Sequence, residues 1–137
     1  MQSYEQNLLP RKMVKSMSEG AELPPQVQEE LLRFQQLQQT LQAVVSQKQQ
    51  LEMEMAETHR ALSELEKVTG ENPVYKSVGS ILVKADKEGL LAELKEKKEL
   101  LNTRVTVLGR QEERTRDRIK DIQQKLQEKL RAPKASE

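Results

Sequence analysis

Few side chains in this sequence could do chemistry, and none stands in a catalytic or metal-binding pattern. His59 is the only histidine, and the absence of cysteine excludes disulfides, thiolate metal sites and a thiol nucleophile. His59 follows Thr58, which lies on the heptad frame described below, so we interpret it as a residue that flanks a helix seam. Neither G-x-x-x-x-G-K-[ST] nor G-x-G-x-x-G occurs, so no phosphate-binding loop is expected.

The charged residues also fit a solvated surface better than an active site. The chain has 23 basic and 22 acidic residues. The resulting net charge of +1 does not favour binding to nucleic acid or to an anionic membrane. The run RQEERTRDR at residues 110–118 interleaves three acidic residues with the basic ones, which indicates an ion-paired helix face. We therefore predict no enzyme activity, no cofactor and no metal.

The composition favours long helices over a globular core. Hydrophobic residues make up 35% of the chain and aromatic residues 2%, too few large side chains to fill a wide interior. No apolar run approaches the roughly 18 residues of a membrane span. The N-terminus lacks the apolar core of a secretory signal, so we expect a cytoplasmic protein without a membrane contact.

The first predicted helix covers residues 24–69 and starts at Pro24-Pro25, where a missing N–H costs nothing. Its apolar residues recur at heptad spacing, which predicts a coiled coil. Lys48 and Thr58 are the polar interruptions of this frame, and Gly70 is expected to end the helix in the left-handed conformation. The apolar frame positions are Phe34, Leu37, Leu41, Val44, Leu51, Met55, Leu62 and Leu65.

Residues 73–85 carry the β signal of the chain. β-Branched and aromatic residues flank Gly79-Ser80, which predicts a tight hairpin. A two-stranded hairpin on its own is only marginally stable in water, so this one is expected to pair with hairpins of other subunits. The alternative is a helical hairpin with an apolar connection. The predicted assembly residues are Val74, Tyr75, Val78, Ile81, Leu82 and Val83.

The second predicted helix covers residues 87–131, with Asp86 as its cap and Gly109 inside it, off the seam. Two arms of nearly equal length on either side of a central reversal predict an antiparallel coiled coil. The expected fold is therefore mainly α, a long antiparallel two-helix coiled coil with a central β-hairpin that pairs with hairpins of other subunits. Residues 1–22 are expected to form a disordered extension, residues 23–131 one domain, and residues 132–137 a tail. The second frame is Leu91, Leu94, Lys98, Leu101, Val105, Leu108, Glu112, Thr115, Ile119, Ile122 and Leu126.

The free ends of the two helices carry more apolar side chains than a two-helix seam is expected to cover. Leu31 and Leu32 are adjacent, so both cannot point into one narrow seam. Exposed apolar surface at this tip would suit the binding of other polypeptides. The alternative is that these residues close or flank the seam. The candidate tip residues are Val27, Leu31, Leu32, Phe34, Leu126 and Leu130.

Five stretches in this order resemble archaeal prefoldin β subunits, over about residues 21–131. They are PPQVQ at residues 24–28, QQLQQ at 35–39, QKQQLEME at 47–54, VYKSVGSILVK at 74–84 and RQEER at 110–114. The hairpin stretch with its flanking coils is the specific part of the resemblance.

The resemblance implies a hexamer of two α and four β subunits. Each β subunit would give its hairpin to a β-barrel body from which coiled coils project. It further implies a cytosolic, ATP-independent chaperone that holds unfolded proteins at the coiled-coil tips and passes them to a group II chaperonin. The competing hypothesis is a structural coiled-coil scaffold or adaptor whose hairpin is only a connector.

Overall fold

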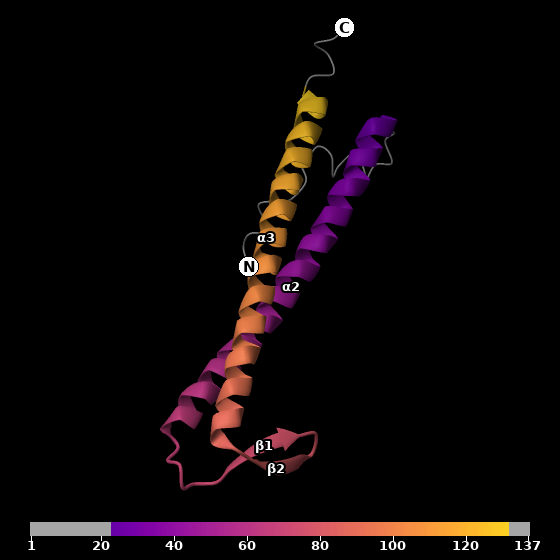
Figure 1. Ribbon diagram of the computed structural model, residues 1–137. Helices are drawn as coiled ribbons and strands as arrows, with labels where there is room; N and C mark the ends of the chain where they lie inside the picture. Colours follow the sequence, from indigo (N-terminus) through magenta and orange to yellow (C-terminus); the bar gives the residue numbers. More distant parts are fainter. Residues whose placement is uncertain (1–22, 132–137) are drawn as a thin grey trace. The chain divides into compact units, whose positions relative to one another are not determined.

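The structure, a computed structural model, describes residues 23–131 as two long helices joined by a β-hairpin (Figure 1). The order is α2 (Pro25–Lys67), β1 (Val74–Val78), β2 (Ile81–Ala85) and α3 (Lys87–Arg131). This confirms the predicted fold class of a helix pair with one central hairpin. The expected elements at 24–69, 73–85 and 87–131 differ from these bounds by no more than two residues at any end. The expectations for residues 1–22 and 132–137 lie outside the described residues.

The chain divides into two compact units, and both helices contribute to each. The hairpin unit is Ser46–Gly109, and the tip unit consists, in its described part, of residues 23–45 and 110–131. The helices run antiparallel inside each unit. In the hairpin unit, Glu54 pairs with Lys97 at 3.7 Å, and Lys87 reaches the carbonyl of Val68. In the tip unit, Glu30 pairs with Lys129.

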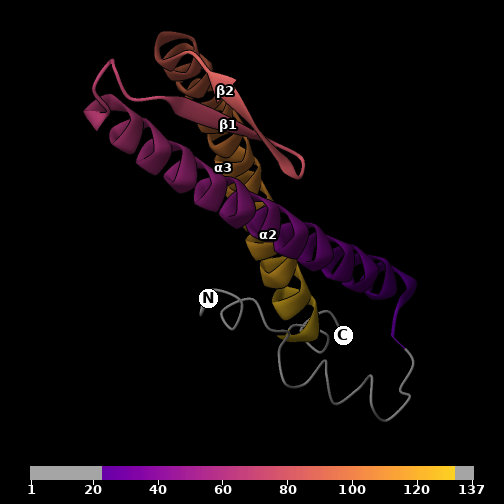
Figure 2. The same cartoon turned by 90° about the horizontal axis from the view of Figure 1, so that it is seen from below.

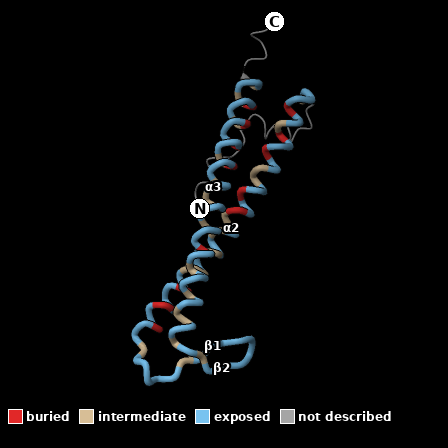
Figure 3. Tube along the Cα trace, viewed as in Figure 1, coloured by how far each residue is buried: buried red, intermediate tan, exposed pale blue. Residues whose placement is uncertain are grey.

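The helix seams follow the two predicted heptad frames. Every frame residue of α2 from Phe34 to Leu65, Lys48 and Thr58 included, is buried or half-buried, and so is every frame residue of α3 from Leu91 to Leu126 (Figure 3). Thr58 and Thr115 are buried polar residues in these seams. Their hydroxyls donate to the carbonyls of Glu54 at 2.9 Å and Gln111 at 2.8 Å, one turn earlier in the same helix. Each hydroxyl is therefore satisfied without a partner across the seam.

α2 ends differently from the sequence expectation. Gly79 is the only described residue with a positive φ, so Gly70 does not adopt the left-handed cap. The last turn is instead tightened by a bond from the Val68 N–H to the Leu65 carbonyl at 3.1 Å. The Lys87 ammonium donates to the Val68 carbonyl at 2.6 Å. A cation at a helix C-terminus satisfies a free carbonyl and suits the dipole, which removes the need for a glycine cap.

α3 begins where the sequence predicted. The Asp86 carboxylate accepts a hydrogen bond from the Gly89 N–H at 3.0 Å, and its carbonyl accepts one from the Leu90 N–H at 2.9 Å. Asp86 is therefore the N-cap of α3. A Cβ added at Gly89 would lie 3.3 Å from the capping carboxylate, so the glycine leaves room for the cap.

The hairpin has the turn and register that its sequence favours. Val74 pairs with Ala85 at one end and Val78 pairs with Ile81 at the other, next to the turn. Gly79 has φ +60° whereas Ser80 does not have a positive φ, which is the pattern of a type II′ turn. The two strands lie side by side in both views of the chain (Figures 1 and 2). They form a sheet of only these two strands in the described residues, so both outer edges are unpaired.

Candidate assembly and client-binding sites

The hairpin presents apolar side chains to solvent on both faces. Opposite residues of an antiparallel pair share a face, so Val78, Ile81 and Val83 lie on one face and Tyr75 and Leu82 on the other. These five side chains are between 44% and 72% exposed, whereas Val74 is half-buried. Five of the six predicted assembly residues are thus exposed on the hairpin, and Val74 at its base is partly covered.

An open groove adjoins the hairpin on the side of α3. Lys76 of β1 shares a face with Val83, with which it pairs, and its ammonium forms an ion pair with Glu93 of α3. Leu100 is 54% exposed and extends the apolar lining of the groove along α3. Sequence reasoning missed Leu100, although its neighbour Leu101 occupies the seam, and two adjacent leucines cannot both face inward. The groove is lined by Lys76, Leu90, Glu93, Leu94, Glu96, Lys97 and Leu100.

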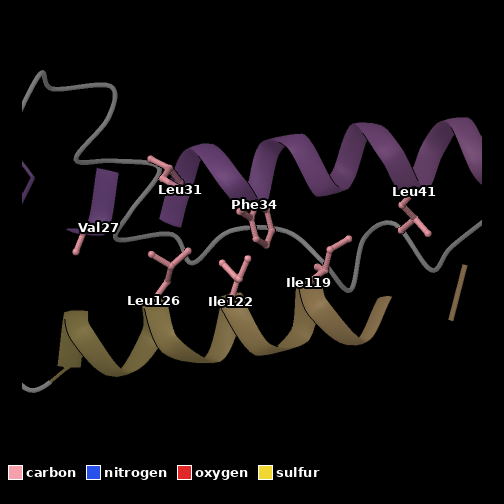
Figure 4. Close-up of a cluster of buried hydrophobic side chains, with 7 residues drawn as sticks. All are labelled: Val27, Leu31, Phe34, Leu41, Ile119, Ile122 and Leu126. Carbon is pink, nitrogen blue, oxygen red and sulfur yellow. The ribbon is translucent and has the colours of Figure 1, made fainter. Parts of the chain in front are cut away.

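The tip residues divide into buried and exposed ones. Phe34 and Leu126 are fully buried, and Val27 and Leu31 are at most 8% exposed. The side chains of Phe34 in α2 and Leu126 in α3 point toward the opposite helix (Figure 4). Leu130 is half-buried against the same cluster, and Leu32 is 56% exposed. We call the buried group the tip cluster; it comprises Val27, Leu31, Phe34, Leu41, Ile119, Ile122 and Leu126.

The structure therefore buries most of the candidate tip residues. Of the six candidate tip residues, Leu32 alone is an exposed large side chain, because it lies one residue from the seam position Leu31. Leu32 is therefore the one candidate that fits the expectation of an apolar side chain left uncovered by the seam. Client binding by the tip residues stays a prediction.

An ion pair joins α2 and α3 at the tip. The Lys129 ammonium of α3 donates to Oε1 of Glu30 in α2, while Oε2 of Glu30 is buried without a hydrogen-bond partner. We call Glu30 and Lys129 the tip pair. Sequence reasoning missed it because the partner of Glu30 depends on the register between the two helices, and the paired residues are 99 positions apart in the chain.

His59 lies on the flank of the seam and is exposed. Its Nδ1 lies 3.0 Å from the ammonium of Lys98, a side chain that can only donate. Within residues 23–131, no three His, Asp or Glu side chains are grouped as metal ligands. On residues 110–118, Glu112 and Arg116 pair at 2.8 Å one turn apart, as the ion-paired interpretation of that run predicts.

No helix among the described residues combines the length and apolar character of a membrane span.

Comparison with known proteins agrees with this architecture. Residues 28–132 match a protein family described as prefoldin subunit. The prefoldin subunit beta of Archaeoglobus fulgidus is 54% identical over 109 residues, which is 80% of this chain and 94% of that protein. The prefoldin subunit beta of Pyrococcus furiosus is 45% identical over 113 residues, 82% of this chain and 97% of that one.

Solved structures show the same fold. The crystal structure of the prefoldin beta subunit from Thermococcus strain KS-1 has a TM-score of 0.74 and 42% identity, covering 82% of this chain and 98% of that one. The beta2 subunit of the same strain has a TM-score of 0.60 at 21% identity and supports the fold alone.

A helix pair with a central hairpin, matched over most of its length by sequence and structure, defines a prefoldin-type chain. This chain belongs to the prefoldin subunit family, a family of molecular chaperones.

Proposed function

We propose that this chain is the β-type subunit of a hexameric chaperone with two α and four β subunits, and that its hairpin is the assembly element. The observation that carries the proposal is the uncovered hairpin, with five large apolar side chains exposed and two unpaired edges. Such a surface is unfavourable on an isolated chain and invites pairing with further strands. Hairpins of neighbouring subunits would supply those strands and close a β-barrel, and a barrel removes sheet edges.

The groove beside the hairpin adds to the surface available for assembly. Leu90, Leu94 and Leu100 line it next to the hairpin face that carries Val78, Ile81 and Val83. A neighbouring hairpin that covers this face would also reach the groove. Burial of apolar area there, at about 25 cal/mol per Å², would stabilise the assembly.

Client proteins are held at the tip in this proposal. Leu32 offers exposed apolar area, and the tip cluster contains further apolar side chains that are buried in the structure. An unfolded client touches several tips at once, so weak binding at each is sufficient. Linked tips raise the overall affinity by about 10²–10⁴ through effective concentration.

The chaperone works in the cytoplasm without nucleotide and passes its clients to a group II chaperonin. No phosphate-binding loop occurs anywhere in the sequence, which supports ATP independence. The test is light scattering of a chemically denatured client diluted into the complex of this chain with a prefoldin α-type subunit. We expect equal suppression of aggregation with and without ATP. A requirement for ATP would contradict the proposal.

The alternative is a coiled-coil scaffold, and the burial of most candidate tip residues is the observation that favours it. A scaffold needs no exposed apolar residues at its free ends, and four of the six candidate tip residues are buried. The same experiment separates the two functions. An assembled complex that leaves client aggregation unchanged is a scaffold, whereas one that suppresses aggregation at stoichiometric amounts is a holdase.

A further inference from the structure

The hairpin has little packing that could fix its orientation on the helices. Five of its large apolar side chains are exposed, and only Val74 and Ala85, at the base of the two strands, are half-buried. A two-stranded sheet on its own is also only marginally stable. The orientation of the hairpin therefore depends on how its two ends are connected and on its polar contacts with the helices.

The hairpin is connected more tightly to α3 than to α2. Asp86 alone lies between β2 and α3, and its carboxylate accepts a hydrogen bond from the Gly89 N–H of α3 at 3.0 Å. Six residues, 68–73, separate α2 from β1. A connection of one capped residue has fewer free dihedral angles than a connection of six, so its ordered state loses less conformational entropy. We therefore expect the hairpin to follow α3 when the chain moves.

Lys87 closes the base of the hairpin. It is the first residue of α3, and its ammonium donates to the carbonyl of Val68, the residue after α2, at 2.6 Å. Within the connection that follows, the Asn72 N–H donates to the Thr69 carbonyl at 3.1 Å. The end of α2 and the start of α3 are thus held together where the chain enters and leaves the hairpin.

An ion pair links the body of the hairpin to α3. Lys76, at the middle of β1, reaches Glu93, six residues after the start of α3. Lys76 is opposite Val83 in the register, so it shares a face of the hairpin with Val78, Ile81 and Val83. The pair therefore fixes the angle between this apolar face and α3.

We infer that Glu93 is a positioning residue, which acts through Lys76 to hold the apolar face of the hairpin in the orientation that a neighbouring subunit's hairpin requires. This inference rests on the proposed function, because it concerns the readiness of the same hairpin for assembly. A hairpin that is free to turn must lose that freedom on association, which weakens binding and slows it. The ion pair removes part of this freedom before the partner binds.

Glu93→Gln tests the inference, because it removes the charge and keeps the size of the side chain. Both partners are about half exposed, so loss of the pair should make other hairpin orientations about two- to fivefold more populated. Glu96→Gln is the matched control, since Glu96 is exposed in the same groove and makes no ion pair with a described residue. The exchange Lys76→Glu with Glu93→Lys rebuilds the pair and should recover at least half of the change.

The first measurement is the orientation of the hairpin in the full-length chain. The sequence contains no cysteine, so Ser80→Cys in the turn and Glu99→Cys on the exposed side of α3 give two unique sites for spin labels. Double electron–electron resonance, with the labelled chain diluted in unlabelled chain, gives the distribution of distances between them. The fraction outside the wild-type peak should be about two- to fivefold larger in Glu93→Gln and unchanged in Glu96→Gln.

The second measurement is the rate of assembly with a prefoldin α-type subunit, followed by stopped-flow light scattering. Glu93→Gln should lower the association rate constant about two- to fivefold, because fewer encounters find the hairpin correctly oriented. The dissociation rate constant should stay unchanged, since the assembled hairpins impose the orientation in either variant. Helix content by circular dichroism should also be the same.

An unchanged distance distribution in Glu93→Gln overturns the positioning role. A broader distribution with an unchanged association rate constant overturns its importance for assembly. Faster dissociation with unchanged association also overturns the inference, because it assigns the pair to the subunit interface itself. If the wild type forms no complex with the α-type subunit, the proposed function fails, and the distance measurement still decides whether Glu93 positions the hairpin.

Discussion

Lys76 in β1 and Glu93 in α3 form an ion pair that ties the exposed hairpin to the helix that follows it. Both side chains are about half exposed, at 44% and 54%. Solvent screening at such exposure limits the pair to about 0.2–1 kcal/mol. A double-mutant cycle with Lys76→Gln and Glu93→Gln, followed by urea unfolding, should give a coupling energy in this range. A coupling several times larger would mean that the pair is buried in the assembled protein.

Gly109 has no packing role in the described chain. A Cβ added there would meet nothing within 4 Å, and Gly109 does not have a positive φ. Glycine in a helix interior is less favourable than alanine by about 0.8–1.0 kcal/mol. Gly109→Ala should therefore stabilise α3 by up to about 1 kcal/mol and raise the midpoint of thermal unfolding followed by circular dichroism. A lower midpoint would show that another subunit packs closely against Gly109.

Phe34 and Leu32 lie two residues apart but differ completely in burial. Phe34 is fully buried in the tip cluster, whereas Leu32 is 56% exposed. Phe34→Ala removes a large side chain from a packed seam, and such changes cost about 3–5 kcal/mol. Leu32→Ala is the matched control and should cost about 0.5 kcal/mol or less, as at other surface positions. Equal losses in the free energy of unfolding from the two substitutions would contradict the difference in burial between Phe34 and Leu32.

The seams could be predicted from sequence because the buried positions of a coiled-coil helix recur at heptad spacing, which can be read from that helix alone. Heptad spacing placed every frame residue from Phe34 to Leu65 correctly. The hairpin was also predictable, since a glycine followed by serine between two apolar runs favours a two-residue turn. Asp86 could be identified as a cap from its own residue type.

The division of the tip residues into buried and exposed ones could not be predicted in the same way. Leu31 and Leu32 are chemically identical, and the one that faces α3 depends on the phase of α2 at its first turns. The Glu30–Lys129 and His59–Lys98 contacts depend on the register between the helices, which neither heptad frame contains. The residue type of Gly70 predicts a left-handed C-cap. The ammonium of Lys87, which follows the hairpin, instead donates to the Val68 carbonyl at the end of α2.

Assembly through the hairpin is the central claim, and Ile81 and Val83 are its most direct probes. Both belong to the same exposed apolar face. Replacing both by Lys places two charges where neighbouring strands would pack, whereas Gln47→Lys with Gln50→Lys adds the same charges to an exposed face of α2. Circular dichroism should show unchanged helix content in both variants.

The deciding measurement is the native mass of the chain purified together with a prefoldin α-type subunit. We predict a six-chain complex for the wild type and for the Gln47→Lys, Gln50→Lys control, and smaller species for the Ile81→Lys, Val83→Lys variant. A full-size complex formed by the hairpin variant would contradict the account.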